Sequence, residues 1–192
     1  MGKAGVRTIV LVLFTVTLLS WSNASYIHLK AQLAQLLIEV AWQNTLSGQP
    51  KQKPWPWADT WPIAKLSSDK LKDDLLVLAS ADGSSLAFGP GHMNGTMQPG
   101  EIGTSVIAGH RDTHFRFLQE LEKGDSMLVQ DETGSWHSFS VAVIEIIDSH
   151  NEPDWNLDLS RDEVHLVTCY PFDAISPGGP LRFIVTLNRF SG

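Results

Sequence analysis

The feature that most constrains this chain is a series of short apolar runs, each ended by residues that turn the backbone. Turn residues such as Asp82-Gly83, Lys123-Gly124-Asp125 and Thr133-Gly134 separate the runs. Several short strands with regularly spaced turns are typical of a β-sandwich or a closed β-barrel. The amphipathic stretch 115–121 predicts one short helix among them. The predicted strands are 62–66, 75–79, 105–108, 126–130, 136–147, 163–168 and 181–187.

Length and charge narrow the class of protein. With 192 residues, of which 43% are hydrophobic, the chain can bury one sizeable core. A net charge of -7 argues against non-specific binding to nucleic acid, which needs a basic surface. The single cysteine excludes an internal disulfide. We therefore expect a single mainly β domain with no nucleic-acid partner and no cofactor.

Residues 1–28 carry the pattern of a membrane anchor. Lys3 and Arg7 precede an uncharged stretch at 8–27. About 20 uncharged residues span roughly 30 Å as a helix, which is enough to cross a bilayer core. The positive charges place the N-terminus in the cytoplasm and the rest of the chain outside. A signal peptide cleaved near Ser22-Asn23-Ala24 is the alternative, and both interpretations predict export.

Residues 29–54 form the next predicted unit, an amphipathic helix followed by a linker. Apolar residues recur there at spacings of three and four, and Gly48 and Pro50 then stop the helix. The predicted β domain occupies 55–192.

Three tryptophans stand at the start of this domain, at Trp55, Trp57 and Trp61. Prolines at 54, 56 and 62 exclude a helix there. The favoured interpretation is an extended segment that packs onto the core, because each Trp can bury a large area. An aromatic surface that binds peptide or sugar is the alternative.

Cys169, the only cysteine, lies where the run 163–168 ends and just before a break that contains Pro171. A thiol at a strand end is accessible from above the sheet. The chemical interpretation is a nucleophile, and the structural one is an inert buried side chain. A nucleophilic thiol needs a proton partner, and an acyl intermediate needs hydrogen-bond donors for its oxyanion.

His110 is the candidate proton partner among the seven histidines. It follows a predicted strand and a glycine, where a loop can place its ring over the sheet. His165 shares a strand face with Cys169 but lies about 13 Å away, too far for a direct hydrogen bond. His110 and His114 have the spacing of a helical zinc pair, but they follow a strand and lack the glutamate of that motif. No metal site is predicted.

Arg182 is the candidate for binding an oxyanion. It lies in the apolar run 181–187, where a strand has one face in the core. The guanidinium fork suits an oxyanion or a peptide carbonyl, whereas the structural alternative is an arginine that reaches from a core strand to solvent. Beside His110, Arg111 and Asp112 are candidates to orient its ring.

These residues, in this order, resemble those of the sortases, a family of membrane-anchored cysteine transpeptidases. The likeness rests on Ala108-Gly109-His110-Arg111, on Leu166-Val167-Thr168-Cys169 and on Arg182. It covers most of 55–192. One departure is His165, at a position where the family usually has Thr or Ser.

The resemblance implies an eight-stranded β-barrel with short helices, preceded by a transmembrane helix and placed on the outer or periplasmic side of the inner (plasma) membrane. It implies that Cys169 attacks the Thr–Gly bond of an LPXTG-like C-terminal sorting signal and forms a thioacyl enzyme. An amine of the cell envelope then resolves that intermediate. His110 would act as general acid and then base, and Arg182 would hold the substrate backbone and the oxyanion. Thr168 and Tyr170 are further candidates for substrate contact.

The runs at 108–115, 169–172 and 177–182 most resemble the sortase subgroup from Gram-negative bacteria, often called class GN. Class D is the nearest alternative. A cysteine hydrolase or peptidase, with water as its main acceptor, is the alternative activity for the same site. The non-catalytic alternative is an envelope-anchored binding module in which Cys169 is merely buried.

Overall fold

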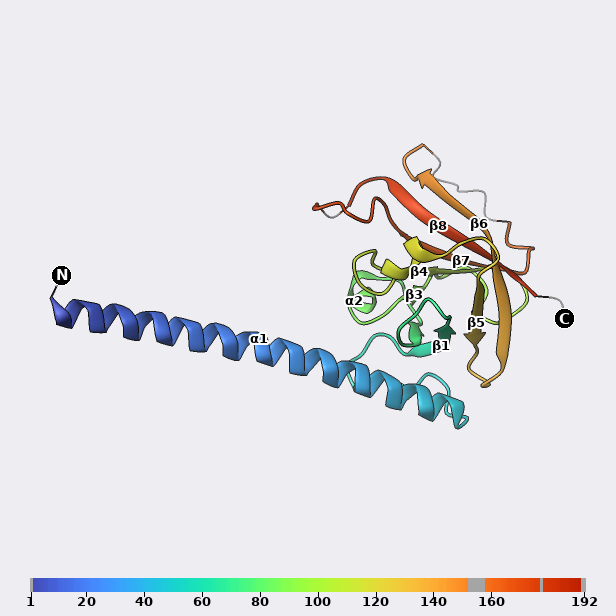
Figure 1. Ribbon diagram of the computed structural model, residues 1–192. Coiled ribbons are helices and arrows are strands. Elements are labelled where there is room, and N and C mark those ends of the chain that lie inside the picture. The colour runs from blue at the N-terminus through green and yellow to red at the C-terminus, as the bar shows by residue number, and fades with distance from the viewer. Residues whose placement is uncertain (1, 152–157, 177, 191–192) are drawn as a thin grey trace. The chain divides into compact units, whose positions relative to one another are not determined.

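The structure, a computed structural model, describes residues 2–151, 158–176 and 178–190 (Figure 1). The chain divides into two compact units, residues 1–37 and 38–192. The first helix, α1 (Lys3–Leu46), contributes to both units. Gly48, with a φ of 88°, follows its end, as is common at helix C-termini.

The transmembrane helix predicted within 1–28 is not confirmed. Over the residues that the structure describes, no helix combines the length and the apolar character that crossing a membrane requires. The predicted anchor and the predicted helix of 29–54 are parts of one continuous helix, because neither Pro nor Gly occurs between Arg7 and Ser47. The predicted boundaries between the three segments stay predictions.

Eight strands close into a β-barrel, as predicted, in the order β1-β2-β3-β4-β7-β8-β6-β5. The pairs β2–β3 and β4–β7 are parallel, and the other described pairs are antiparallel. The strands are β1 (Pro62–Ser67), β2 (Leu75–Leu78), β3 (Gly91–His92), β4 (Ser105–Ala108), β5 (Ser126–Gln130), β6 (Trp136–Asp148), β7 (Glu163–Cys169) and β8 (Leu181–Arg189).

Seven of these strands lie where the sequence predicts them, and β3 is the exception. It has two residues in a stretch whose glycines and proline indicate a turn. The predicted short helix is confirmed as the 3-10 helix η1 (Arg116–Glu120). A short helix, α2 (Gly83–Leu86), occupies a place where only a turn is predicted.

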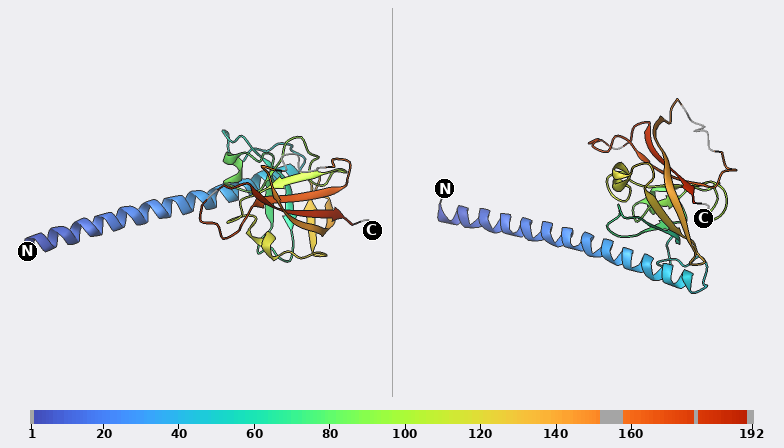
Figure 2. Two further views of the ribbon diagram at one scale, coloured as in Figure 1. Left: turned by 90° about the horizontal axis from the view of Figure 1, so that it is seen from above. Right: turned by 45° about the vertical axis from the view of Figure 1, so that its right-hand side comes forward.

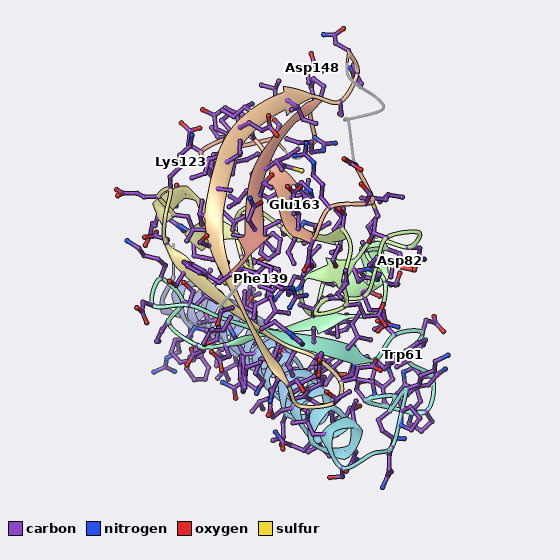
Figure 3. The ribbon with its side chains drawn as sticks, turned by 90° about the vertical axis from the view of Figure 1, so that its right-hand side faces the viewer. Trp61, Asp82, Lys123, Phe139, Asp148 and Glu163 are labelled. Carbon is purple, nitrogen blue, oxygen red and sulfur yellow. The ribbon has the colours of Figure 1, made fainter. Side chains whose placement is uncertain are left out.

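The main core fills the barrel. The long strand β6 curves from Phe139 to Asp148, and Phe139 is buried in this core (Figure 3). Phe115 and Leu118, from the η1 region, belong to the same cluster. Other fully buried members are Ala64, Leu66, Val77, Ile107, Met127, Val129, Leu166, Val185 and Leu187.

The tryptophan segment packs onto the domain, as favoured from the sequence. Trp55 meets Phe88 edge to face, with ring centroids 5.1 Å apart. Trp61 packs against the main core. Only Trp57 of the three is largely exposed, at 79%. A binding surface built from all three rings is therefore not present.

Candidate active site

The ends of β4 and β7 and the start of β8 lie side by side (Figure 2, left view). Pairing of β4 with β7 continues beyond the end of β4. Gly109 N–H donates to Val167 O at 3.0 Å, and Thr168 Oγ1 donates to Gly109 O at 2.7 Å. The next residues on the two segments are His110 and Cys169. Because each follows these contacts by one residue, we infer that His110 and Cys169 are neighbours.

Cys169 and Arg182 are register partners in the antiparallel pair of β7 and β8. Directly opposed residues project from the same face of a sheet, on strands about 4.8 Å apart. We therefore infer that His110, Cys169 and Arg182 lie across three adjacent segments, and these three residues are here called the His–Cys–Arg row. All three residues singled out for catalysis in the sequence are gathered in it.

The thiol of Cys169 is free and half-buried. Val167 and Thr168 before it are buried. Tyr170 N–H after it donates to Leu181 O at 3.0 Å, so strand pairing holds the backbone on both sides of the cysteine. The backbone is fixed while the side chain keeps access to solvent, which suits a nucleophile better than an inert core thiol.

His110 is exposed, and its carbonyl accepts a hydrogen bond from Phe115 N–H at 2.9 Å. Residues 111–115 form turns, so His110 and His114 do not have the helical geometry of a zinc pair. Burial, and secondly the charge of His110, lower the pKa of half-buried His114. Among the described residues no group of three or more His, Cys, Asp or Glu side chains could hold a metal ion.

Gly109 lies between the end of β4 and His110, and it is in such close contact with Phe115 that a larger residue would not fit. A Cβ at this position would lie 2.7 Å from Cγ of Phe115, whose ring is fully buried. The ring supports the turn that starts at His110. Close packing therefore requires glycine between the strand and the histidine.

We expect Gly109→Ala to destabilise the fold by about 1–3 kcal/mol, because the new methyl group must displace a packed ring. Urea unfolding measures this change. Gly83→Ala is the matched control, since a Cβ there meets nothing within 4 Å. Equal stability of the two variants would contradict the packing argument.

Arg182 is half-buried and already has two partners. Its Nη1 donates to Gly179 O at 2.7 Å and to Leu181 O at 2.9 Å. The guanidinium therefore steadies the turn before β8. An arginine carries five N–H donors, so donors beyond those used at Nη1 remain for a substrate.

Thr168 and Tyr170 flank the nucleophile in different environments. The Thr168 hydroxyl is buried and joins β7 to the His110 segment through Gly109. Tyr170 stacks on Phe183, with ring centroids 6.2 Å apart, and meets Phe172 edge to face. Both side chains hold the site together, and their contact with substrate stays a prediction.

Arg111 has a role that the sequence does not reveal. Instead of orienting the His110 ring, its buried Nη2 donates to Ala174 O at 3.0 Å and to Ser176 O at 2.8 Å. It ties the segment after β4 to the loop after β7. Only its position next to His110 could have drawn attention to it.

His165 lies away from the row, as predicted. It is buried, contacts the Thr186 hydroxyl through Nδ1 at 3.0 Å, and lies 3.4 Å from Glu163. Burial lowers its pKa, and Glu163 opposes that shift. His92 is similar, because burial lowers its pKa while a hydrogen bond with Met97 O opposes the shift.

These shifts predict loss of stability in mild acid. The pKa values of His92, His114 and His165 lie below 6.5 in the folded state, so the unfolded chain binds more protons as pH falls through about 6.5. We expect the free energy of unfolding to decrease from pH 7.5 to pH 5.5. Urea titrations across this range measure it, and His165→Gln should flatten the dependence. An unchanged slope in that variant would refute the contribution of His165.

Comparison with known proteins decides the family. Residues 66–189 match the family model described as the sortase domain. The chain belongs to the sortase family. Sortase D of Bacillus subtilis (strain 168) is 32% identical over 120 residues, which cover 62% of this chain and 60% of that relative. The matched region thus spans less than two thirds of that sortase.

Solved sortases share the fold. Sortase A from Corynebacterium diphtheriae matches with a TM-score of 0.61 at 21% identity, over 83% of this chain and 85% of that chain. Sortase C-1 from Actinomyces oris matches with a TM-score of 0.58 at 28% identity, over 68% and 75%. These matches agree with the eight-stranded sortase barrel. They do not confirm the Gram-negative subgroup.

Proposed function

We propose that this chain is a sortase transpeptidase that acts on a protein with an LPXTG-like C-terminal sorting signal. The observation that carries the proposal is the His–Cys–Arg row in a chain of the sortase family. Cys169 is the nucleophile, His110 the general acid and base, and Arg182 the oxyanion and backbone donor. The subgroup that we propose is class GN, with class D as the alternative.

The chemistry divides into two half-reactions. The Cys169 thiolate adds to the carbonyl carbon of the scissile bond, and His110 gives its proton to the leaving amine as the C–N bond breaks. A thioester remains on Cys169. An incoming amine then attacks the thioester, gives up a proton to His110, and releases the thiolate.

Arg182 is the source of hydrogen-bond donors for the negative charge that develops on the carbonyl oxygen. Its place opposite Cys169 supports this role.

We expect Arg182→Lys to reduce kcat/KM about a hundredfold, because lysine keeps the charge but loses the planar fork. Steady-state transpeptidation with a sorting-signal peptide measures the effect. Activity equal to that of the unchanged chain would remove Arg182 from the mechanism.

Trapping the acyl enzyme tests the proposed function directly. The full chain is incubated with a library of C-terminal sorting peptides and without an amine, and its intact mass is measured. We expect a thioester adduct that maps to Cys169 and that an added amine converts to product. If every peptide in the library fails to give an adduct, the proposal is wrong. If an adduct reacts only with water, the hydrolase alternative is correct.

We also propose that the barrel works outside the cytoplasm, held to the inner membrane by the N-terminal segment. Lys3 and Arg7 before the uncharged stretch support this orientation. Fractionation of cells that produce the full chain tests whether it is attached to the inner membrane. Treatment of spheroplasts with protease, which reaches only the outer face of that membrane, then tests where the barrel lies. Protection of the barrel from protease in intact spheroplasts would place it in the cytoplasm instead.

A further inference from the structure

The outward face of β7 leads from the candidate nucleophile to a second group of polar side chains. Val164 and Leu166 belong to the main core inside the barrel. Because side chains alternate along a strand, Glu163, His165 and Cys169 lie on the opposite face. Along the strand, His165 is about 13 Å from Cys169 and Glu163 about 20 Å. One face of β7 therefore carries the thiol at its end and two polar residues at its start.

Apolar side chains separate these two ends. Val167 stands between His165 and Cys169 in the alternation along β7. It packs with Val106 and Ile184 in a small cluster that is separate from the main core. The order along this face is thus thiol, apolar cluster and polar residues. An LPXTG-like signal has the same order, because its apolar Leu and Pro come shortly before the scissile bond.

The polar end of this face borders a cavity of about 540 Å³, here called the Glu163 cavity. The described residues that line it are Asp158, Arg161, Glu163 and His165. The side chains of Glu163 and His165 are only 13% and 8% exposed, so they lie deep. Those of Asp158 and Arg161 are 52% and 64% exposed, so they lie near solvent. The volume is large enough for a long side chain of a bound peptide.

The lining residues carry an excess of negative charge. Arg161 Nη1 lies 3.5 Å from Glu163 Oε1, and His165 Nε2 lies 3.4 Å from Glu163 Oε2. Charge-assisted hydrogen bonds are usually about 2.7–2.9 Å long, so this carboxylate keeps capacity for a stronger donor. Arg161 is also shared with Asp158, at 3.2 Å. Burial lowers the pKa of His165, so two carboxylates face one guanidinium among the described lining residues.

We propose that the Glu163 cavity binds a basic side chain of the protein substrate, a Lys or Arg that precedes the sorting motif. This inference rests on the proposed function. Glu163 and Asp158 accept hydrogen bonds from the substrate cation and share them with Arg161. The added cation balances the charge of the cavity, whereas an acidic side chain at the same place would be repelled.

The length of β7 sets the position of this basic residue. A peptide acylated on Cys169 and extended along the strand advances about 3.3 Å per residue. The cavity then lies about four to six residues before the acylated Thr, at the distances of His165 and Glu163. Leu is the third residue before that Thr in an LPXTG-like signal. The cavity therefore contacts residues outside the motif itself.

The test uses sorting peptides that have three Ala residues before Leu, with a single Lys or a single Glu placed at each of these positions in turn. For each peptide, kcat/KM for thioester formation on the full chain is measured by intact mass. We expect the Lys peptide to exceed the Glu peptide about tenfold at one position, and added salt to reduce this ratio.

Variants of the cavity connect this preference to its residues. Glu163→Gln should bring the ratio of the Lys to the Glu peptide close to one, and Asp158→Asn should lower it in part. Arg161→Gln should raise the ratio, because a competing cation is removed. Glu122→Gln is the matched control, since it removes one exposed carboxylate outside the described lining of the cavity and should keep the ratio. Thermal unfolding checks that each variant is folded.

Other results would overturn the inference. If the unchanged chain forms a thioester with every peptide at the same rate, the proposed function stands and the basic-residue site is wrong. If Glu122→Gln lowers the ratio as much as Glu163→Gln, the charge of the whole chain, and not the cavity, causes the preference.

Binding separates this inference from the proposed function. The Lys and Glu peptides are titrated into Cys169→Ala, and the NMR signals of the His165 ring are followed. If no peptide forms a thioester but the Lys peptide binds more tightly than the Glu peptide, and Glu163→Gln removes that difference, only the proposed function is wrong. Equal binding of the two peptides, or no binding, excludes the site.

Discussion

Cys169→Ala is expected to abolish thioester formation and to reduce transpeptidation more than about a thousandfold. The alanine side chain cannot attack a carbonyl, and no second cysteine is available in the chain. Because Cys169 is half-buried at a strand end, the change should cost the fold no more than about 1 kcal/mol. Intact-mass analysis for the adduct and thermal unfolding for the fold separate the two effects.

The unchanged chain provides the control for this result. Alkylation of the folded protein should modify Cys169 and remove activity, since the thiol is accessible. A sorting-signal exchange that survives both Cys169→Ala and alkylation would show that another group is the nucleophile. A thiol that reacts only after denaturation would support the buried, structural interpretation.

His110→Ala is expected to reduce kcat/KM by about a hundredfold to ten-thousandfold, the usual range for a lost general acid and base. The acid is needed when the amine leaves and the base when the new amine arrives, so both half-reactions should slow. Single-turnover acylation and the subsequent aminolysis measure the two steps separately.

His114→Ala is the matched control for that variant. His114 lies four residues away in the same turn region but outside the His–Cys–Arg row. Its loss should affect activity far less, and it should act mainly through stability. Equal losses for the two variants would mean that the turn, rather than the imidazole of His110, is what catalysis requires.

The local patterns of this chain carry much of the fold. The spacing of apolar residues and the positions of turn residues locate seven of the eight strands and the η1 helix. Both patterns depend only on residues that are close together in the sequence. The strand β3 is not predicted, because two residues are too few to show the alternation of side chains that marks a strand. The continuity of α1 across the predicted boundary near residue 28 also follows from the sequence once the absence of Pro and Gly is weighed.

The sequence by itself determined the identity of the candidate nucleophile and its two partners, because Cys169, His110 and Arg182 stand in short motifs. Only the tertiary structure decided that these residues form a row. Their adjacency depends on hydrogen bonds such as that from Thr168 to Gly109, two residues that lie 59 positions apart in the sequence. The contacts of Arg111 with Ala174 and Ser176 have the same origin. Strand register between distant segments sets them, and no local pattern encodes that register.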